Sequence, residues 1–139
     1  MKISQTVPDL NALKAARAQA AKLAHDVGKY ISRMARNLGD GDIPQPVAVL
    51  LFKDLFAIDG KNTAANVFET YAAALEAIMK DSRLTECRIK LKEIDSLKGS
   101  IANEDTAAMR KAATLALEIE ESLNDICRDI GSAIENFRL

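Results

Sequence analysis

Apolar residues recur every three or four positions along two long stretches of this chain, one near each end. In residues 9–38 the apolar or small positions are Leu10, Leu13, Ala20, Ala24, Val27, Ile31, Met34 and Leu38, with Arg17 as the one polar interruption. In the last third of the chain they are Met109, Ala112, Leu115, Ile119, Leu123, Ile126, Ile130, Ile134 and Phe137. Steps that alternate between three and four residues are the heptad pattern of helices packed along their length. The pattern therefore predicts two long helices, the first of about eight turns and the second of about thirty residues.

Three shorter helices are expected between the two long ones. Residues 47–58 are apolar at nearly every position, which indicates a helix that is buried on most sides. Thr63 is a good N-cap for a helix ending near Lys80, and Asp81 and Ser82 mark a break before a helix that ends near Ile101. The positions expected to be buried in these last two helices are Val67, Phe68, Tyr71, Leu75, Ile78, Met79, Leu84, Cys87, Leu91 and Ile94, with Leu97 or Ile101.

The connections between these helices are short, apart from a linker over residues 39–46. The linker contains two glycines and two prolines, which interrupt helices. Short connections place consecutive helices side by side and antiparallel, and a chain of 139 residues usually makes one domain. We therefore predict an all-α, up-and-down bundle of four to five helices in a single domain over residues 1–139. The long helices could also pair across a homodimer, which the sequence leaves open.

The composition agrees with a helical, cytoplasmic protein. Aromatic residues make up only 4% of the chain, whereas strands are rich in them. No apolar run approaches the ~20 residues that span a bilayer, the N-terminus lacks an apolar signal region, and a net charge of −1 gives no overall attraction to nucleic acid or membranes. The charge is uneven, because residues 9–36 contain six basic and two acidic side chains, and residues 104–138 contain four basic and eight acidic ones. The two ends of the chain are therefore complementary and could pack together.

No residue pattern indicates a bound metal or cofactor. Cys87 and Cys127 are too far apart in the sequence for a metal or redox motif, and we expect both to be buried as small apolar residues in a reducing compartment. Asp40 and Asp42 resemble the start of a calcium loop, but the later ligands are missing, which indicates a polar linker. We therefore expect no metal and no cofactor.

His25 is the single histidine of the chain and lies in the first long helix. At 100° per residue it lies about 140° from the centre of the apolar face, on the same side as Lys22 and Lys29. We therefore expect His25 to be exposed beside basic side chains. Gly28 is its neighbour on the predicted helix surface. Because glycine inside a helix costs ~1 kcal/mol relative to alanine, we expect its small size to have a purpose, which is to leave room beside the imidazole.

The residues around His25 resemble the phosphoacceptor region of histidine phosphotransfer domains. As in sensor-kinase dimerisation hairpins, an acid, Asp26, directly follows the histidine; stand-alone phosphotransfer domains have lysine and glycine at the third and fourth positions after it, where this chain has Gly28 and Lys29 in the reverse order. The resemblance implies that His25 is the phosphoacceptor and that a phospho-aspartyl receiver domain is the partner. It also implies that Asp26 orients the ring, that Lys22 and Lys29 stabilise the phosphoryl group, and that Gly28 provides access. The His-Asp pair is also similar to the core of HD-type metal phosphohydrolases, but those need further histidines, which this chain lacks.

Two functional interpretations follow from these patterns. The leading one is a small cytoplasmic interaction or adaptor protein, with bacterial signalling as one setting, that acts through helical surfaces and is not an enzyme. Its expected partner-binding residues are Leu51, Phe52, Leu55 and Phe56, although the apolar helix that carries them would serve equally as the centre of the core. The alternative is a phosphotransfer protein that uses His25, and only in that case should the function depend on the imidazole.

Overall fold

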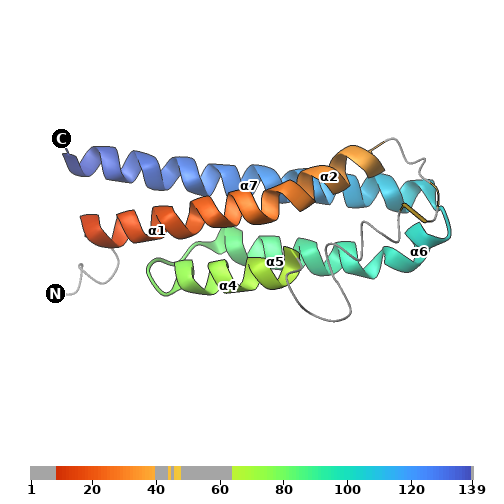
Figure 1. Ribbon diagram of the computed structural model, residues 1–139, viewed down its shortest axis with the longest axis horizontal. Helices are drawn as coiled ribbons and strands as arrows, with labels where there is room; N and C mark the ends of the chain where they lie inside the picture. Colours follow the sequence, from red (N-terminus) through yellow and green to blue (C-terminus); the bar gives the residue numbers. More distant parts are fainter. Residues whose placement is uncertain (1–8, 40–43, 45, 48–63, 139) are drawn as a thin grey trace.

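The computed structural model describes residues 9–39, 44, 46, 47 and 64–138, and these residues form an all-α bundle without strands (Figure 1). The elements are α1 (Leu10–Lys22), a π-helical turn (Leu23–Val27), α2 (Gly28–Leu38), α4 (Ala64–Glu76), α5 (Ser82–Ser96), α6 (Lys98–Ala102) and α7 (Thr106–Arg138). The first three follow each other directly and make one continuous rod, which we call the N-terminal helix (residues 10–38). The rods that follow, α4, α5 with α6, and α7, each run against the rod before. The predicted up-and-down helical bundle is therefore confirmed.

Aspartates start three of the helices by accepting hydrogen bonds from backbone N–H groups that no helical carbonyl can reach. Asp9 accepts from the N–H of Ala12 at 2.8 Å, and Asp81 accepts from the N–H of Arg83 at 3.0 Å. The carboxylate of Asp105 does the same at the start of α7. Such caps stabilise a helix because its first four N–H groups otherwise lack partners. The predicted helix starts near Asp9 and at the break after Asp81 are therefore confirmed.

The N-terminal helix buries a stripe that differs in part from the predicted one. Its buried apolar residues are Leu13, Ala16, Ala20, Leu23, Val27, Ile31, Met34, Ala35 and Leu38. Leu10 is half-buried, and Ala35 is buried although it was not predicted to be. Ala16 is buried and Arg17 is exposed, while Leu23 is buried and Ala24 is only half-buried. Adjacent positions such as these both lie within an apolar stripe more than ~100° wide, so the period alone does not choose between them. The prediction of one regular helix was also wrong, because residues 23–27 form a π turn.

The predicted seam of α7 is confirmed from Met109 to Ile134. Phe137 was predicted to be buried, but it is 48% exposed. The reason is its position in the last turn, because the end of α7 extends past the turn that joins α4 to α5 (Figure 1).

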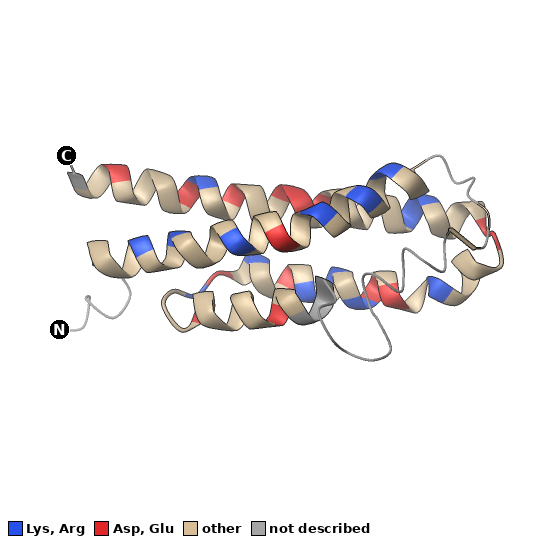
Figure 2. Cartoon of the chain, in the orientation of Figure 1, with Lys and Arg blue, Asp and Glu red and all other residues tan. Residues whose placement is uncertain are grey.

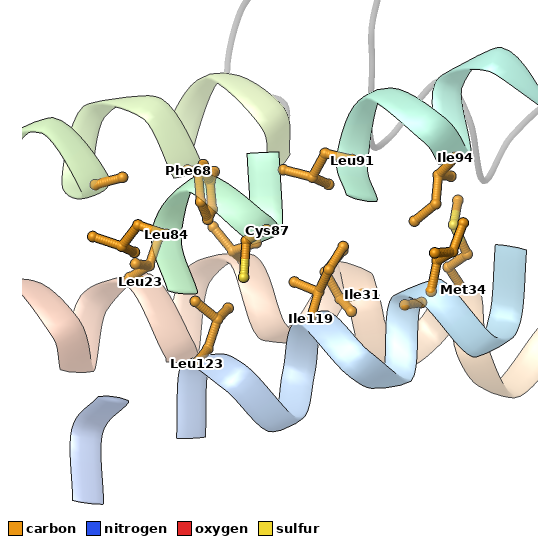
Figure 3. Packing of buried hydrophobic residues seen from close by; sticks show 14 of the residues in the cluster. Leu23, Ile31, Met34, Phe68, Leu84, Cys87, Leu91, Ile94, Ile119 and Leu123 are labelled. Carbon is orange, nitrogen blue, oxygen red and sulfur yellow. The ribbon is translucent and has the colours of Figure 1, made fainter. Parts of the chain in front are cut away.

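The shorter helices supply the rest of the core, which Figure 3 shows from close by. Their buried residues are Phe68, Ala72, Leu75, Leu84, Cys87, Leu91, Ile94 and Ile101, while Val67, Tyr71, Ile78, Met79 and Leu97 are half-buried. Two predicted boundaries were wrong. The helix expected to reach Lys80 ends at Glu76, and the one expected to run to Ile101 is divided at Leu97 into α5 and α6. Thr63, most of the linker over residues 39–46 and all but the first residue of the predicted helix over residues 47–58 lie outside the described residues.

The mostly basic N-terminal helix packs against α7 along its length, as the charge distribution suggested (Figure 2). Ser32 donates a hydrogen bond to Glu120, and the Cys127 thiol donates one to the carbonyl of Ala20 at 3.3 Å. Cys127 is half-buried and not fully buried as expected, because it lies at the border between these two helices. In the part of the chain that the structure describes, no helix combines the length and the apolar content needed to cross a bilayer.

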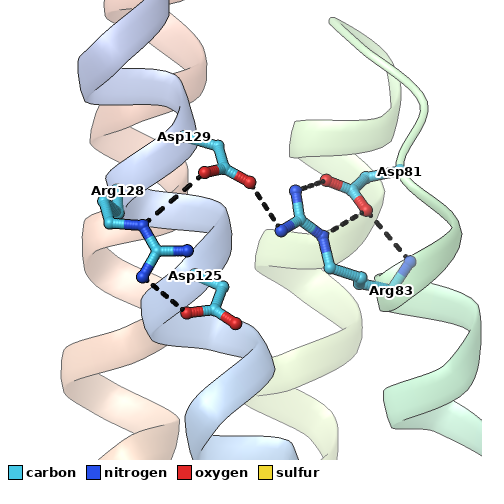
Figure 4. A network of polar contacts seen from close by, with 5 residues as sticks. All are labelled: Asp81, Arg83, Asp125, Arg128 and Asp129. Carbon is cyan, nitrogen blue, oxygen red and sulfur yellow. Dashed lines mark hydrogen bonds and ion pairs between the residues drawn. The ribbon is translucent and has the colours of Figure 1, made fainter.

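Ion pairs join α5 to α7 on the other side of the bundle. Lys90 lies 3.6 Å from Glu118, and Lys111 lies 3.0 Å from Glu93. Figure 4 shows a third contact, in which Arg83 reaches Asp129 at 2.7 Å while also holding Asp81. The polar contacts of α7 with α5 are therefore spread over most of the length of α5.

Candidate functional site

His25 lies in the middle of the π turn, and its side chain is 81% exposed. Its exposure agrees with the position expected on the outer face of the helix. A π turn contains one more residue per turn than an α-helix and is frequently found at functional sites. Here it widens the helix at the one histidine of the chain. The N–H of Gly28 closes the turn by bonding to the carbonyls of Ala24 and His25.

The imidazole of His25 is held by the next residue in the chain. Its Nδ1 lies 2.8 Å from Oδ1 of Asp26, whose side chain is 37% exposed. The hydrogen bond from His25 lowers the pKa of Asp26; burial opposes this, and the Tyr71 hydroxyl and the charges of His25 and Lys29 lower it further. Asp26 is therefore ionised at neutral pH and accepts the bond. This assigns the proton to Nδ1 and, in the neutral ring, the lone pair to Nε2.

Tyr71, which lies in α4, completes the site from a distant part of the chain. Its hydroxyl donates to Oδ2 of Asp26 at 3.3 Å, 45 positions away in the sequence. Burial raises the pKa of Tyr71, and the negative charge of Asp26 raises it further, so the phenol keeps its proton and can donate. Sequence reasoning placed Tyr71 only among the core positions. The available signal was its hydroxyl, which needs a polar partner when partly buried, but nothing in the sequence identified that partner.

The two predicted lysines lie on either side of this pair without a direct contact to the imidazole. The ammonium of Lys22 lies 5.9 Å from the centre of the Tyr71 ring. Lys29 instead lies over Tyr30, at 5.2 Å from the ring centre, although its charge still contributes to the low pKa of Asp26. The structure therefore brings together Lys22, His25, Asp26 and Tyr71, with Lys29 at the edge.

Gly28 was expected on the surface beside His25, and that expectation was wrong. Gly28 is buried, because it directly follows the completely buried Val27 at the edge of the packed face and has no side chain that could extend to solvent. A Cβ atom built at this position would meet no atom within 4 Å, so no close neighbour requires glycine here.

Other candidate residues do not join the site. Burial raises the pKa of the Cys87 thiol to about 11, so it is protonated at neutral pH, and burial also raises the pKa of Cys127. Among the described residues, no three His, Cys, Asp or Glu side chains come close enough to hold a metal ion. The residues expected to bind a partner, Leu51, Phe52, Leu55 and Phe56, lie outside the described residues.

Comparisons with models of protein families, with curated proteins and with solved structures gave no match for this chain.

Proposed function

We propose that this protein is a histidine phosphotransfer protein, in which Nε2 of His25 accepts a phosphoryl group from a phospho-aspartyl receiver domain. The observation that carries the proposal is the geometry of the imidazole. The ring is exposed, yet its Nδ1 is bonded to an ionised carboxylate, which leaves the lone pair on the other nitrogen. An exposed nucleophile of defined tautomer is what a transfer between two docked proteins requires.

The proposed transfer needs no further reactant. The Nε2 lone pair attacks the phosphorus of the aspartyl phosphate, an N–P bond forms, and the P–O bond to the partner's carboxyl group breaks. The carboxylate leaves with the bonding electron pair. No proton has to move, because Nδ1 keeps its proton and the ring becomes a phosphorylated imidazolium. Its positive charge then lies beside the carboxylate of Asp26, 2.8 Å from Nδ1, which stabilises the product.

The surroundings of His25 also fit a charged phosphoryl group. Lys22 lies next to the site, and α2 carries Lys29, Arg33 and Arg36 on its exposed side without an acidic residue. Cations near the reacting centre stabilise the negative charge on the transferring oxygens. The same charges would attract the acidic surface around a receiver aspartate. In this proposal the protein works in the cytoplasm as a carrier between two receiver domains.

The test uses the full chain and phosphoramidate, a small phosphoryl donor that needs no partner protein. We expect the wild type to gain one phosphoryl group in the intact mass, with a phosphorus NMR resonance typical of an N–P bond. His25→Gln should gain none and should unfold at the same urea concentration, because the replaced side chain is exposed. The proposal is overturned if the wild type stays unmodified under conditions in which free histidine is phosphorylated.

A second candidate is a helical adaptor protein without a reaction of its own. It is favoured by two large apolar side chains on the outer surface, Ile89 of α5 at 59% exposure and Leu117 of α7 at 54%. Single exposed apolar residues are common, so this support is weaker than that of the imidazole geometry. A partner recovered by pull-down would separate the two functions. If the protein is an adaptor, the His25→Gln variant still binds this partner, whereas the Ile89→Lys or Leu117→Lys variant does not. The biological activity of an adaptor is also retained without the imidazole.

A further inference from the structure

The carboxylate of Asp26 is engaged at both of its oxygens by two different residues. Oδ1 lies 2.8 Å from Nδ1 of His25, and Oδ2 accepts from the Tyr71 hydroxyl at 3.3 Å. A carboxylate held at one oxygen can still rotate about its Cβ–Cγ bond, whereas one held at both cannot turn without losing a bond. The orientation of Asp26 therefore depends on a residue outside its own helix.

Tyr71 is itself held firmly enough to orient another side chain. It lies in α4, which packs against both α1 and the π turn. Its neighbours on that helix, Phe68, Ala72 and Leu75, are completely buried. The ammonium of Lys22 lies over the ring, 5.9 Å from its centre. The hydroxyl is thus brought to the π turn by the packing of the core.

We infer that Tyr71 is a positioning residue, which holds the Asp26 carboxylate so that Asp26 keeps the imidazole of His25 in its Nδ1-protonated form. The hydroxyl of Tyr71 bonds to Asp26 and Asp26 bonds to the ring, so the effect of Tyr71 on His25 passes through Asp26. Without the hydroxyl, the carboxylate can turn toward water or toward Lys29, and the bond to Nδ1 weakens. The ring then populates both neutral tautomers, and a smaller fraction has its lone pair on Nε2. The expected effect of Tyr71 on the rate of phosphorylation rests on the proposed function, whereas its expected effect on the tautomer of His25 does not.

The first experiment is nitrogen NMR of the imidazole, which is unambiguous because the chain has one histidine. Protonated and unprotonated ring nitrogens resonate at well separated positions. In the wild type at a pH where the ring is neutral, we expect Nδ1 to be the protonated nitrogen. In Tyr71→Phe we expect both nitrogens to shift toward intermediate values. Tyr30→Phe is the matched control, because it removes the only other tyrosine hydroxyl of the chain and keeps the ring beneath Lys29. An unchanged tautomer in Tyr71→Phe overturns the inference.

The second experiment measures the rate of phosphorylation by phosphoramidate in a double-mutant cycle. Losing one orienting hydrogen bond should slow Tyr71→Phe by about threefold to tenfold, and Asp26→Asn by at least as much. Because Tyr71 acts through Asp26, adding Tyr71→Phe to Asp26→Asn should cause no further loss. An additive loss in the double variant overturns the inference. If the wild type itself does not react, the proposed function fails, while the NMR measurement still decides the role of Tyr71.

Discussion

The N-terminal helix and α7 are the two longest rods of the bundle, and they lie side by side in opposite directions (Figure 1). α7 continues for 33 residues without interruption and contacts α5 through ion pairs along its outer edge. The N-terminal helix buries an equally regular stripe at both of its ends, but the π turn divides it at residues 23–27. All the polar groups of the candidate site gather at that interruption or opposite it.

The two long helices make different kinds of polar contact. The ion pairs of α7 join it to a neighbouring helix, whereas the contacts at the π turn present a side chain that can react. The ion pairs between α5 and α7 join opposite charges across a helix boundary, and both members of each pair are engaged by the partner. The contacts at the π turn form a chain instead, in which Tyr71 holds Asp26, Asp26 holds His25, and the last member faces solvent. A regular helix is sufficient to pack the core. The chain of polar contacts that presents the imidazole is found at the irregular turn, and such turns are frequent at functional sites.

The prediction with the largest expected effect tests whether the core residues of the two long helices contribute equally to the free energy of unfolding. Ile119 of α7 and Ile31 of α2 are both completely buried and lie in the same part of the core (Figure 3). Each truncation to alanine removes apolar contact and leaves a cavity, so we expect each to lower the free energy of unfolding by about 3 kcal/mol. Urea unfolding followed by circular dichroism measures both. A much smaller loss for Ile31→Ala would show that the N-terminal helix is less firmly packed than α7.

The control for this comparison lies two residues away from Ile119. Leu117 is on the same helix but is 54% exposed. Leu117→Ala should therefore change the free energy of unfolding by less than about 0.5 kcal/mol. A large loss there would mean that Leu117 is covered in solution, for example by a second copy of the chain.

The contrast between the two helices also explains what the sequence could predict. The period of α7 was readable because nothing interrupts it, and eight of its nine predicted core positions, from Met109 to Ile134, are buried. The N-terminal helix was harder to predict, because its apolar residues continue at steps of three or four through residues 23–27, so the hydrophobic pattern does not reveal the π turn there. The choice between Ala16 and Arg17, and between Leu23 and Ala24, depends on which neighbours pack against the helix, and the period does not contain that information.

In the candidate site, only the features that depend on residues close together in the sequence could be predicted. The exposure of His25 follows from its angle on the helix, and the contact with Asp26 joins adjacent residues. Tyr71 could not be assigned, because its approach to Asp26 depends on how α4 packs against the π turn. The burial of Gly28, next to the completely buried Val27, depends on how this part of the helix packs. Contacts within one turn of helix were thus accessible from the sequence, while those made by packing were not.

A smaller effect is expected from the ion pairs that distinguish α7. Arg83 lies 2.7 Å from both Asp81 and Asp129, so it joins the start of α5 to α7 (Figure 4). Arg83→Gln should lower the free energy of unfolding by about 1 kcal/mol at pH 7. Arg128→Gln is the control, because Arg128 is 69% exposed and pairs only within α7, with Asp125 and Asp129, among the described contacts. It should have almost no effect.

The pH dependence of this loss has a definite sign. Burial raises the pKa of Asp81, but the hydrogen bonds and charge of Arg83 outweigh burial, so the pKa in the folded protein is lower than in the unfolded chain. The stabilisation is therefore complete above the unfolded value of about 4 and disappears as the pH falls through the lower, folded value. Urea unfolding at pH 7, 5 and 3 should show the difference between wild type and Arg83→Gln shrinking only at the lowest pH. A difference that stays constant would assign the loss to packing of the long side chain.

The prediction with the smallest expected change in the free energy of unfolding concerns one glycine in each long helix. Gly28 ends the π turn and Gly131 lies within α7, both are helical, and a Cβ atom at either position would have no neighbour within 4 Å. Alanine restricts the unfolded chain more than glycine does, so Gly28→Ala and Gly131→Ala should each raise the free energy of unfolding by about 0.5–1 kcal/mol. The same Gly28→Ala protein should react with phosphoramidate at the wild-type rate, because the buried glycine does not line the approach to His25. If Gly131→Ala stabilises the protein and Gly28→Ala does not, the π turn itself requires glycine at its end. If Gly28→Ala is stable but slow to react, the space beside the imidazole is needed for access, as the sequence first suggested.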